Sequence, residues 1–331
     1  MKPSRMRTER ILCPTDYSDF SERALEQAVR LARWFYASVT VVHVVAPTPW
    51  AASPDRGFIA IPGDLLHVQR QEEEEALERF VAPYRGKGVA IHTRLIEGDA
   101  SRAIQALALE LPADLVVIGT HGRGGFEHLV LGSVTEKVLR RATCPVLTVG
   151  IGTPTAIAAP LFRRILCALD LTEGSERTLE VALSLAEENM ARVTLLHVLE
   201  GVPGWAGPPR YRALPQVARI RKELFEATEK RLVDSVSTED RAFCWVTERV
   251  EEGIPWREVL RVADVSDADV IVMGAHSRGA LDQALFGSTA NHVVRAARCP
   301  VLIVKEPAGR EPVGKEASAT GVTALLASVV A

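Results

Sequence analysis

The sequence contains one pattern twice, at a distance that corresponds to a whole domain. The segment RILCPTD at residues 10–16 returns as RILCALD at residues 164–170, which is 154 residues further along a chain of 331 residues. Later, GTHGRG at residues 119–124 returns as GAHSRG at residues 274–279, 155 residues further along. This period is too long for a solenoid repeat and is typical of a duplicated domain.

The repeat predicts the organisation of the chain. We expect a first domain at residues 1–150 and a second at 164–305, with a linker at 151–163 and a flexible tail at 306–331. Two segments rich in Pro and Gly, 46–63 and 200–215, contain Trp50 and Trp205 and are expected to form contact loops.

Within the first copy, short apolar runs alternate with stretches of helical spacing. The runs rich in β-branched residues predict five strands, at residues 11–14, 39–45, 89–95, 115–118 and 146–149. A helix is expected to start at Ser18-Asp19. Such alternation requires crossover connections, so we predict two tandem doubly wound α/β domains, each a five-stranded parallel sheet with helices on both faces. Ligands of such sheets bind beyond the carboxyl ends of the strands, here after residues 15 and 118.

Composition narrows the classes of partner. The chain has 47% hydrophobic and 24% charged residues and a formal net charge of −3, as in an ordinary globular protein, so a nucleic-acid partner is not expected. The basic start is followed by no signal-peptide core, and no run of 18 apolar residues occurs. We therefore expect a cytoplasmic protein without membrane attachment. Its five cysteines match no metal-ligand spacing and are interpreted as reduced core thiols.

A glycine-rich loop follows the fourth predicted strand of the first copy, with the spacing Gly119-x2-Gly122-x9-Gly132-Ser133. Glycines tolerate positive φ and let backbone N–H groups converge on an anion, and a helix opening at Ser133 adds unpaired N–H donors. Neither a Walker A loop nor a dinucleotide Gly-x-Gly-x-x-Gly fingerprint is present. The loop predicts a phosphate site, with Arg123 and a divalent cation to balance the remaining charge.

This loop, on such a fold and opened by residues 11–16, resembles the universal stress protein family, and the resemblance covers both copies. Matching the ATP-binding branch of that family position by position implies adenine contacts at Pro14, Thr15, Asp16 and Val44. It implies ribose and phosphate contacts at Gly119, His121, Gly122, Arg123, Gly132, Ser133, Val134 and Thr135. The implied cofactor is ATP, with Mg²⁺ coordinated through its phosphates and no metal site of the protein's own.

The second copy departs from the motif. Ser277 stands where the first copy has Gly122, Ala168 and Leu169 replace Pro14 and Thr15, and Ala290 replaces Thr135. We expect weaker binding there, because a serine in a glycine position costs about 1 kcal/mol or more if positive φ is required. The weaker candidate contacts of the second copy are Asp170, Val198, Gly274, His276, Ser277, Arg278, Gly287, Ser288 and Thr289.

Four residues in or near the predicted sites also have a purely structural interpretation. Asp16 can bind a ligand or cap the helix that follows it, and both roles can hold. Glu136 has capping-box spacing from Ser133, which we favour over a general base. His43 and His197 lie in apolar strands and are interpreted as hydrogen-bonded core histidines.

The sequence favours one function over two alternatives. The first is an ATP-binding stress-response protein whose nucleotide occupancy regulates conformation or partner choice. In this interpretation the two copies pair within one chain through their apolar fifth strands, and a homodimer is a further option. The second is a slow ATP hydrolase or phosphotransferase, although no catalytic constellation is evident and no catalytic residue is assigned. The third is a nucleotide-free interaction module, which the decayed second motif and the Trp-bearing loops favour.

Overall fold

A computed structural model describes residues 8–46, 63–122, 131–150, 152–153, 162–172, 174–201, 214–275 and 286–305. The tail, most of the predicted linker and most of the two contact loops, including Trp50 and Trp205, lie outside these ranges. So do Arg123, His276, Ser277 and Arg278.

Strand and helix alternate through both copies, as predicted. In the first copy the elements are β1 (Arg10–Thr15), α1 (Asp19–Phe35), β2 (Ser38–Val45), α2 (Gly63–Val81), η2 (Ala82–Tyr84), β3 (Ile91–Glu97), α3 (Ala100–Glu110), β4 (Leu115–Gly119), α4 (Ser133–Arg141) and β5 (Val146–Val149). In the second they are β6 (Arg164–Ala168), α5 (Ser175–Asn189), β7 (Arg192–Leu199), α7 (Pro215–Asp234), α8 (Thr238–Phe243), β8 (Trp245–Glu252), α9 (Pro255–Val265), β9 (Val270–Gly274), α10 (Ser288–Ala296) and β10 (Val301–Val304).

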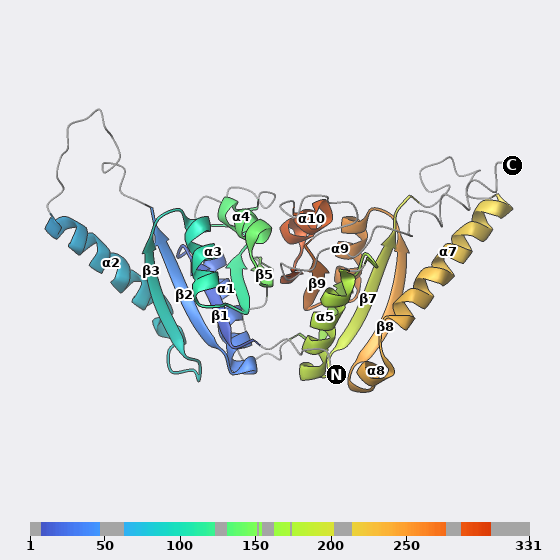
Figure 1. Cartoon of the computed structure of the whole chain (residues 1–331), viewed down its shortest axis with the longest axis horizontal. Helices are drawn as coiled ribbons and strands as arrows, with labels where there is room; N and C mark the ends of the chain where they lie inside the picture. The colour runs from blue at the N-terminus through green and yellow to red at the C-terminus, as the bar shows by residue number, and fades with distance from the viewer. Residues whose placement is uncertain are drawn as a thin grey trace, which may run out of the picture.

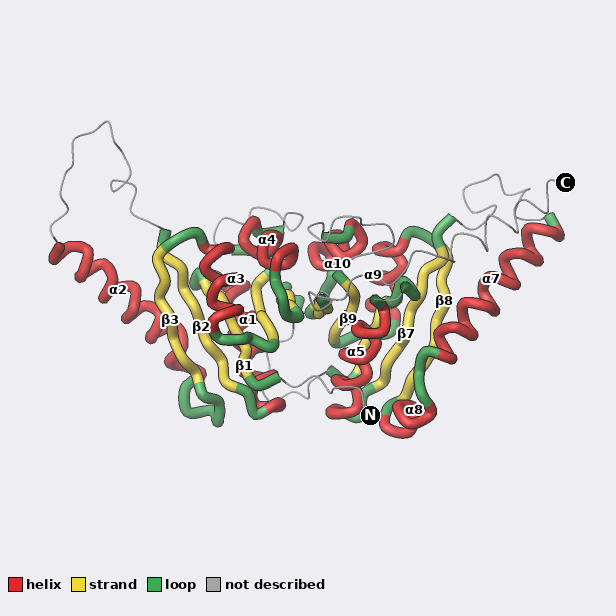
Figure 2. Tube along the Cα trace, in the orientation of Figure 1, coloured by secondary structure: helices red, strands yellow, loops and turns green. Residues whose placement is uncertain are grey.

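The strands of both copies form one sheet, in the order β3-β2-β1-β4-β5-β10-β9-β6-β7-β8. Neighbours within each copy are parallel, whereas β5 and β10 pair antiparallel and join the two halves. Figure 1 shows the halves side by side, with α2 and α7 at the outer flanks, and Figure 2 shows the strands between the helices. A mostly parallel α/β sheet is thereby confirmed.

Each face of the sheet carries a core that runs through both halves. The strands are apolar on both faces, because successive side chains alternate between two helical layers. One core packs β1, β2, β4 and β5 and their counterparts against α1, α2 and α5, with Leu25, Val29 and Leu185 almost fully buried. The other packs the same strands against α3, α4, α9 and α10, around Ile104, Leu139 and Val293.

The third strand begins later than the sequence predicts. It spans Ile91–Glu97 rather than 89–95. Gly86 and Gly88 adopt φ of +75° and +79°, so the chain is still turning at these residues, and pairing with β2 begins at Ile91. β-branched Val89 suggested a strand where the turn geometry does not allow one.

An aspartate fixes the amino end of the first strand in each half. The Asp114 Oδ2 atom accepts hydrogen bonds of 2.9 Å from the backbone N–H groups of Glu9 and Arg10. Asp269 does the same for Arg163 and Arg164, at 2.6 and 2.9 Å. The duplication therefore preserved the placement of strand ends as well as the core.

Candidate functional site

The hydrogen-bonded ladder between the central strands of the first half ends where the sequence places the ligand. β1 pairs with β4 only at Ile11 and Leu12, although β1 continues to Thr15 and β4 to Gly119. Pro14 lies in this unpaired part and has no N–H to donate to a neighbouring strand. This is also the point where strand order reverses, which is the usual ligand position of doubly wound sheets.

In the second half the corresponding hydrogen-bonded ladder is longer. β6 pairs with β9 through four residues, from Ile165 to Ala168. Ala168 replaces Pro14 and pairs with Met273. The two copies therefore differ at the position most relevant to a ligand.

Asp16 and Ser18 organise the turn from β1 into α1. Ser18 is the N-cap of α1, with its side chain accepting from the Ser21 N–H. Asp16 Oδ1 accepts from the Ser18 N–H at 3.1 Å and from the Ser18 hydroxyl at 2.6 Å. The expectation that Asp16 caps the helix is therefore wrong, because the helix begins three residues later; Asp16 instead orients the residue that caps it.

The glycine loop closes against this turn. A β-carbon at Gly122 would collide with the Asp16 Oδ2 atom, and one at Gly119 would lie 3.0 Å from the Phe20 backbone carbonyl carbon. At Gly132 it would lie 3.3 Å from the Thr120 carbonyl oxygen. None of these three glycines has a positive φ, so the expected conformational reason is wrong and the requirement is for space.

Helix α4 presents its N-terminus at the end of this loop. Gly132 is its N-cap and forms no side-chain cap, so the first-turn N–H groups are left for solvent or a ligand. Ser133 is the first helical residue and is exposed. A capping box from Ser133 to Glu136 is therefore wrong, since Ser133 lies inside the helix, and Glu136 instead pairs with Arg140 at 2.8 Å.

Buried hydrogen bonds hold α4 to the end of β4. The Thr135 hydroxyl donates to the Gly119 carbonyl at 2.7 Å, and the Gly132 N–H donates to the Thr120 carbonyl at 2.9 Å. Thr135 is only 4% exposed. Its hydroxyl thus positions the loop. In the second copy Ala290 stands here and has no hydroxyl to donate.

A second group of side chains lies beside the end of β1. Tyr17, at φ +63°, packs its ring 4.3 Å from that of His43 and 5.5 Å from that of Phe80. His43 Nδ1 contacts the Thr15 carbonyl at 2.8 Å, and Nε2 lies 3.8 Å from the Glu73 carboxylate. The prediction of a hydrogen-bonded histidine is confirmed, but sequence reasoning missed Tyr17, Phe80 and Glu73, which come together only in the fold.

The structure brings most of the predicted site residues of the first copy to this edge. Asp16 contacts Gly122, and Thr135 contacts both Gly119 and Gly132. His121 packs against Phe20 with ring centroids 4.9 Å apart. Val44 and Val134 pack partly buried against one core, whereas Pro14 and Thr15 are buried. The Thr15 hydroxyl donates to the Ser21 hydroxyl at 3.0 Å.

The second copy repeats the frame with different side chains. Asp170 Oδ1 accepts from the Thr172 N–H and from the hydroxyls of Thr172 and Ser175. Leu171 takes the place of Tyr17 with φ +57°, and buried His197 contacts the Leu169 carbonyl at 2.7 Å. At α10, Gly287 is the N-cap and Ser288 and Thr289 are the first two helical residues. Gly274 is the last residue of β9, and Val198 lies near the end of β7.

Burial makes the cysteines of both copies poor nucleophiles. It raises the pKa of Cys13 to about 12 and that of Cys144 to about 11, and it also raises the pKa of Cys167, Cys244 and Cys299. All five are free thiols. Across the described ranges, no cluster of three or more His, Cys, Asp or Glu side chains could hold a metal ion, and no helix has the length and apolarity to span a bilayer.

The universal stress protein family model matches residues 7–150 and again residues 161–305. The chain belongs to the universal stress protein family. A universal stress protein of Methanocaldococcus jannaschii is 38% identical over 141 residues, covering 43% of this chain and 81% of that protein. One of Mycolicibacterium smegmatis is 26% identical over 304 residues, covering 89% of this chain and 96% of that protein.

A solved structure shares the tandem fold. The universal stress protein from Archaeoglobus fulgidus matches with a TM-score of 0.63 and 22% identity, covering 92% of this chain and 98% of the other. At this identity the match shows the fold alone. The resemblance inferred from the glycine loop is thus confirmed for both copies of this universal stress protein.

Proposed function

We propose that the first domain binds ATP at the carboxyl edge of β1 and β4, and that occupancy of this site regulates a stress response. The observation that carries the proposal is the close contact between Gly122 and Asp16, which leaves no room for a β-carbon at residue 122. Glycine at this position lets the loop backbone lie beside Asp16 at the carboxyl edge, where its N–H groups can face an anion.

The phosphates would be held mainly by backbone groups. The N-terminus of α4 offers the N–H groups of Ser133 and Val134 together with the positive end of the helix dipole. The exposed hydroxyl of Ser133 adds a donor, whereas Thr135 acts by holding Gly119. Adenine would lie toward Asp16 and Val44, and Arg123 would contribute charge. Mg²⁺ coordinated through the phosphates would offset the nearby Asp16 carboxylate.

The site is proposed to bind nucleotide without rapid turnover. The Glu136 carboxylate is engaged by Arg140, which argues against its service as a general base. Burial keeps the cysteine thiols protonated. A regulatory role therefore agrees better with these side chains than hydrolysis does.

One contact offers a route from this site to the second domain. Lys305, the residue after β10, donates from Nζ to the Arg140 carbonyl at 3.2 Å, near the C-terminus of α4. The N-terminus of the same helix is the proposed phosphate site. A shift of α4 on binding would therefore change a contact across the seam between the two halves.

The second domain is proposed to bind nucleotide more weakly. Ala168 extends the ladder between β6 and β9, whereas Pro14 has no N–H to donate to β4. Ala290 cannot hold Gly274 as Thr135 holds Gly119. Ser277 also stands where the first copy has Gly122, so the second motif lacks this glycine.

The deciding experiment is to denature freshly purified protein and to identify and count the released nucleotides by chromatography and mass spectrometry. About one ATP per chain is the expected result. About two per chain would overturn the ranking of the domains, and ADP alone would favour the hydrolase alternative. No nucleotide, together with no change in Tm on adding Mg-ATP, would favour an interaction module that works without nucleotide.

A further inference from the structure

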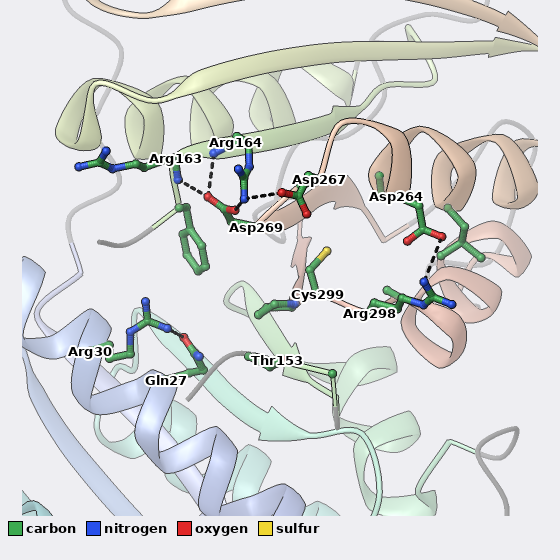
Figure 3. Close-up of a pocket in the computed structure, with 17 residues that line it drawn as sticks. Gln27, Arg30, Thr153, Arg163, Arg164, Asp264, Asp267, Asp269, Arg298 and Cys299 are labelled. Atoms are coloured by element: carbon green, nitrogen blue, oxygen red, sulfur yellow. Dashed lines mark hydrogen bonds and ion pairs between the residues drawn. The ribbon is translucent and has the colours of Figure 1, made fainter. Parts of the chain in front are cut away.

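A separate cavity of about 530 Å³ lies at the seam between the two domains (Figure 3). One wall comes from α1 and from the turn after β5, and the other from the amino ends of β6, β9 and β10 with the ends of α9 and α10. Its size is within the ~300–1,000 Å³ typical of ligand pockets. It shares no lining residue with the proposed nucleotide site.

The first wall contains a buried cation. Arg30 is 8% exposed, and its Nη1 atom donates to the Gln27 Oε1 atom at 3.0 Å, with Gln27 only 1% exposed. Burial lowers the pKa of Arg30, while Asp269 and Glu26 act in the opposite direction. A guanidinium removed from water gains most from an anion close to it.

This cation is not required by the fold. The positions of Gln27 and Arg30 in the second copy are occupied by Val181 and Ser184, which are buried on α5. The duplicated helix therefore packs well without the pair. Burying a charge is costly, so its presence in only one copy points to a specific use.

Thr153 adds a hydroxyl that has no hydrogen-bond partner among the described residues. The residue is 2% exposed and lines the cavity. Its backbone is fixed, because its N–H donates to the Gly150 carbonyl and its carbonyl accepts from Arg23, both at 3.3 Å. A buried hydroxyl held in place without a partner costs free energy that a bound ligand would recover.

The opposite wall carries acids that already have cationic partners. Asp269 and Asp267 contact Arg164 at 2.9 and 3.1 Å. Figure 3 shows this cluster across the cavity from Arg30, with Asp264 and Arg298 forming another pair at 4.0 Å. Because the carboxylates are paired, they do not exclude an anion from the neighbourhood of Arg30.

We propose that this seam cavity binds a small organic anion, with a phosphate or carboxylate group on the Arg30 guanidinium and an oxygen acceptor on the Thr153 hydroxyl. The ligand contacts both domains, so its binding stabilises their relative placement. The inference stands on Arg30 and Thr153 and is independent of whether the glycine loop binds ATP.

The test is isothermal titration of the protein, without added nucleotide, with glucose 6-phosphate and separately with succinate. The expected result is binding of at least one probe, weakened about tenfold or more by Arg30→Gln and less by Thr153→Val. Binding of glucose 6-phosphate alone assigns a phosphate ester, and binding of succinate alone assigns a carboxylate. Arg33→Gln is the matched control, because Arg33 is an exposed arginine on the same helix.

Two further variants keep the result interpretable. Arg30→Lys retains the charge and should retain part of the affinity, which separates loss of the cation from loss of folding. Gly122→Ala should leave binding of the probe unchanged. The proposal is overturned if neither probe binds, or if Arg30→Gln binds as well as the wild type while remaining folded. It is also overturned if a folded Gly122→Ala variant no longer binds the probe, because the probe would then occupy the nucleotide site.

Discussion

The Oδ2 atom of Asp16 lies within collision distance of the position that a β-carbon of Gly122 would take, so the turn after β1 and residue 122 pack closely together. Neither residue is near the other in the sequence. Asp16 is fixed by its bonds from Ser18, and the glycine accepts the close approach. The contact makes the loop sensitive to a single methyl group.

The first prediction concerns this contact. Gly122→Ala should lower the free energy of unfolding by about 1–3 kcal/mol and weaken ATP binding about tenfold or more, because the methyl group would push the Asp16 carboxylate away from its bonds with Ser18. Urea unfolding and nucleotide titration measure the two effects. Gly287→Ala in the second domain is the comparison, and an equal loss of bound ATP from both variants would contradict the ranking of the domains.

A double variant separates the collision from other effects of Gly122→Ala. Asp16→Ala removes the obstructing oxygen, so adding it to Gly122→Ala should cost less than the sum of the two single changes. Additive losses of unfolding free energy would mean that the Asp16 contact is not what requires glycine at this position.

The second prediction compares two serines at helix starts. Ser18→Ala should destabilise the protein by about 1 kcal/mol, because Ser18 caps α1 and binds Asp16. Ser133→Ala should leave unfolding unchanged within about 0.5 kcal/mol, since Ser133 is exposed, and should weaken only nucleotide binding. A destabilising effect of Ser133→Ala would instead support a capping role for Ser133, which the position of Ser133 inside α4 argues against.

The third prediction concerns the bond that ties α4 to β4. Thr135→Val removes the donor to the Gly119 carbonyl in a buried position and should cost about 1–3 kcal/mol of stability. Thr135→Ser keeps the hydroxyl and should retain most of the nucleotide affinity. If Thr135→Val binds ATP normally, α4 does not depend on this bond for its placement.

The fourth prediction is a pH dependence at the seam. Burial lowers the pKa of Lys305 from 10.5 to about 8, so between about pH 8 and pH 10.5 the unfolded chain binds more protons at this residue than the folded one. The contribution of Lys305 to stability should therefore rise with pH across that window, by up to roughly 3 kcal/mol.

Lys305→Met isolates this contribution from the other groups that titrate at alkaline pH. The difference in unfolding free energy between wild type and variant, measured by urea titration at several pH values, should shift in favour of the wild type as pH rises from about 8 toward 10.5. A difference that is independent of pH would show that Lys305 titrates normally in the folded protein.

Much of the fold could be predicted from the sequence because its signals are local. The repeated apolar runs marked the strands, and Ser18 marked the start of α1. The third strand was misplaced because two glycine turns override the preference of Val89 for strand. The site was predicted less completely, since Tyr17 from the turn after β1 and Phe80 and Glu73 from α2 come together beside His43 of β2.

The sequence by itself determined the duplicated α/β domain, the glycine loop and the inequality of the two motifs, because these depend on periodicity and on residues close together in the chain. Only the tertiary structure decided that β5 and β10 pair antiparallel, that Gly122 is needed for space and that Arg30 faces a cavity between the domains. Such features arise from contacts between segments about 100 residues or more apart, and no local propensity encodes which side chains will meet.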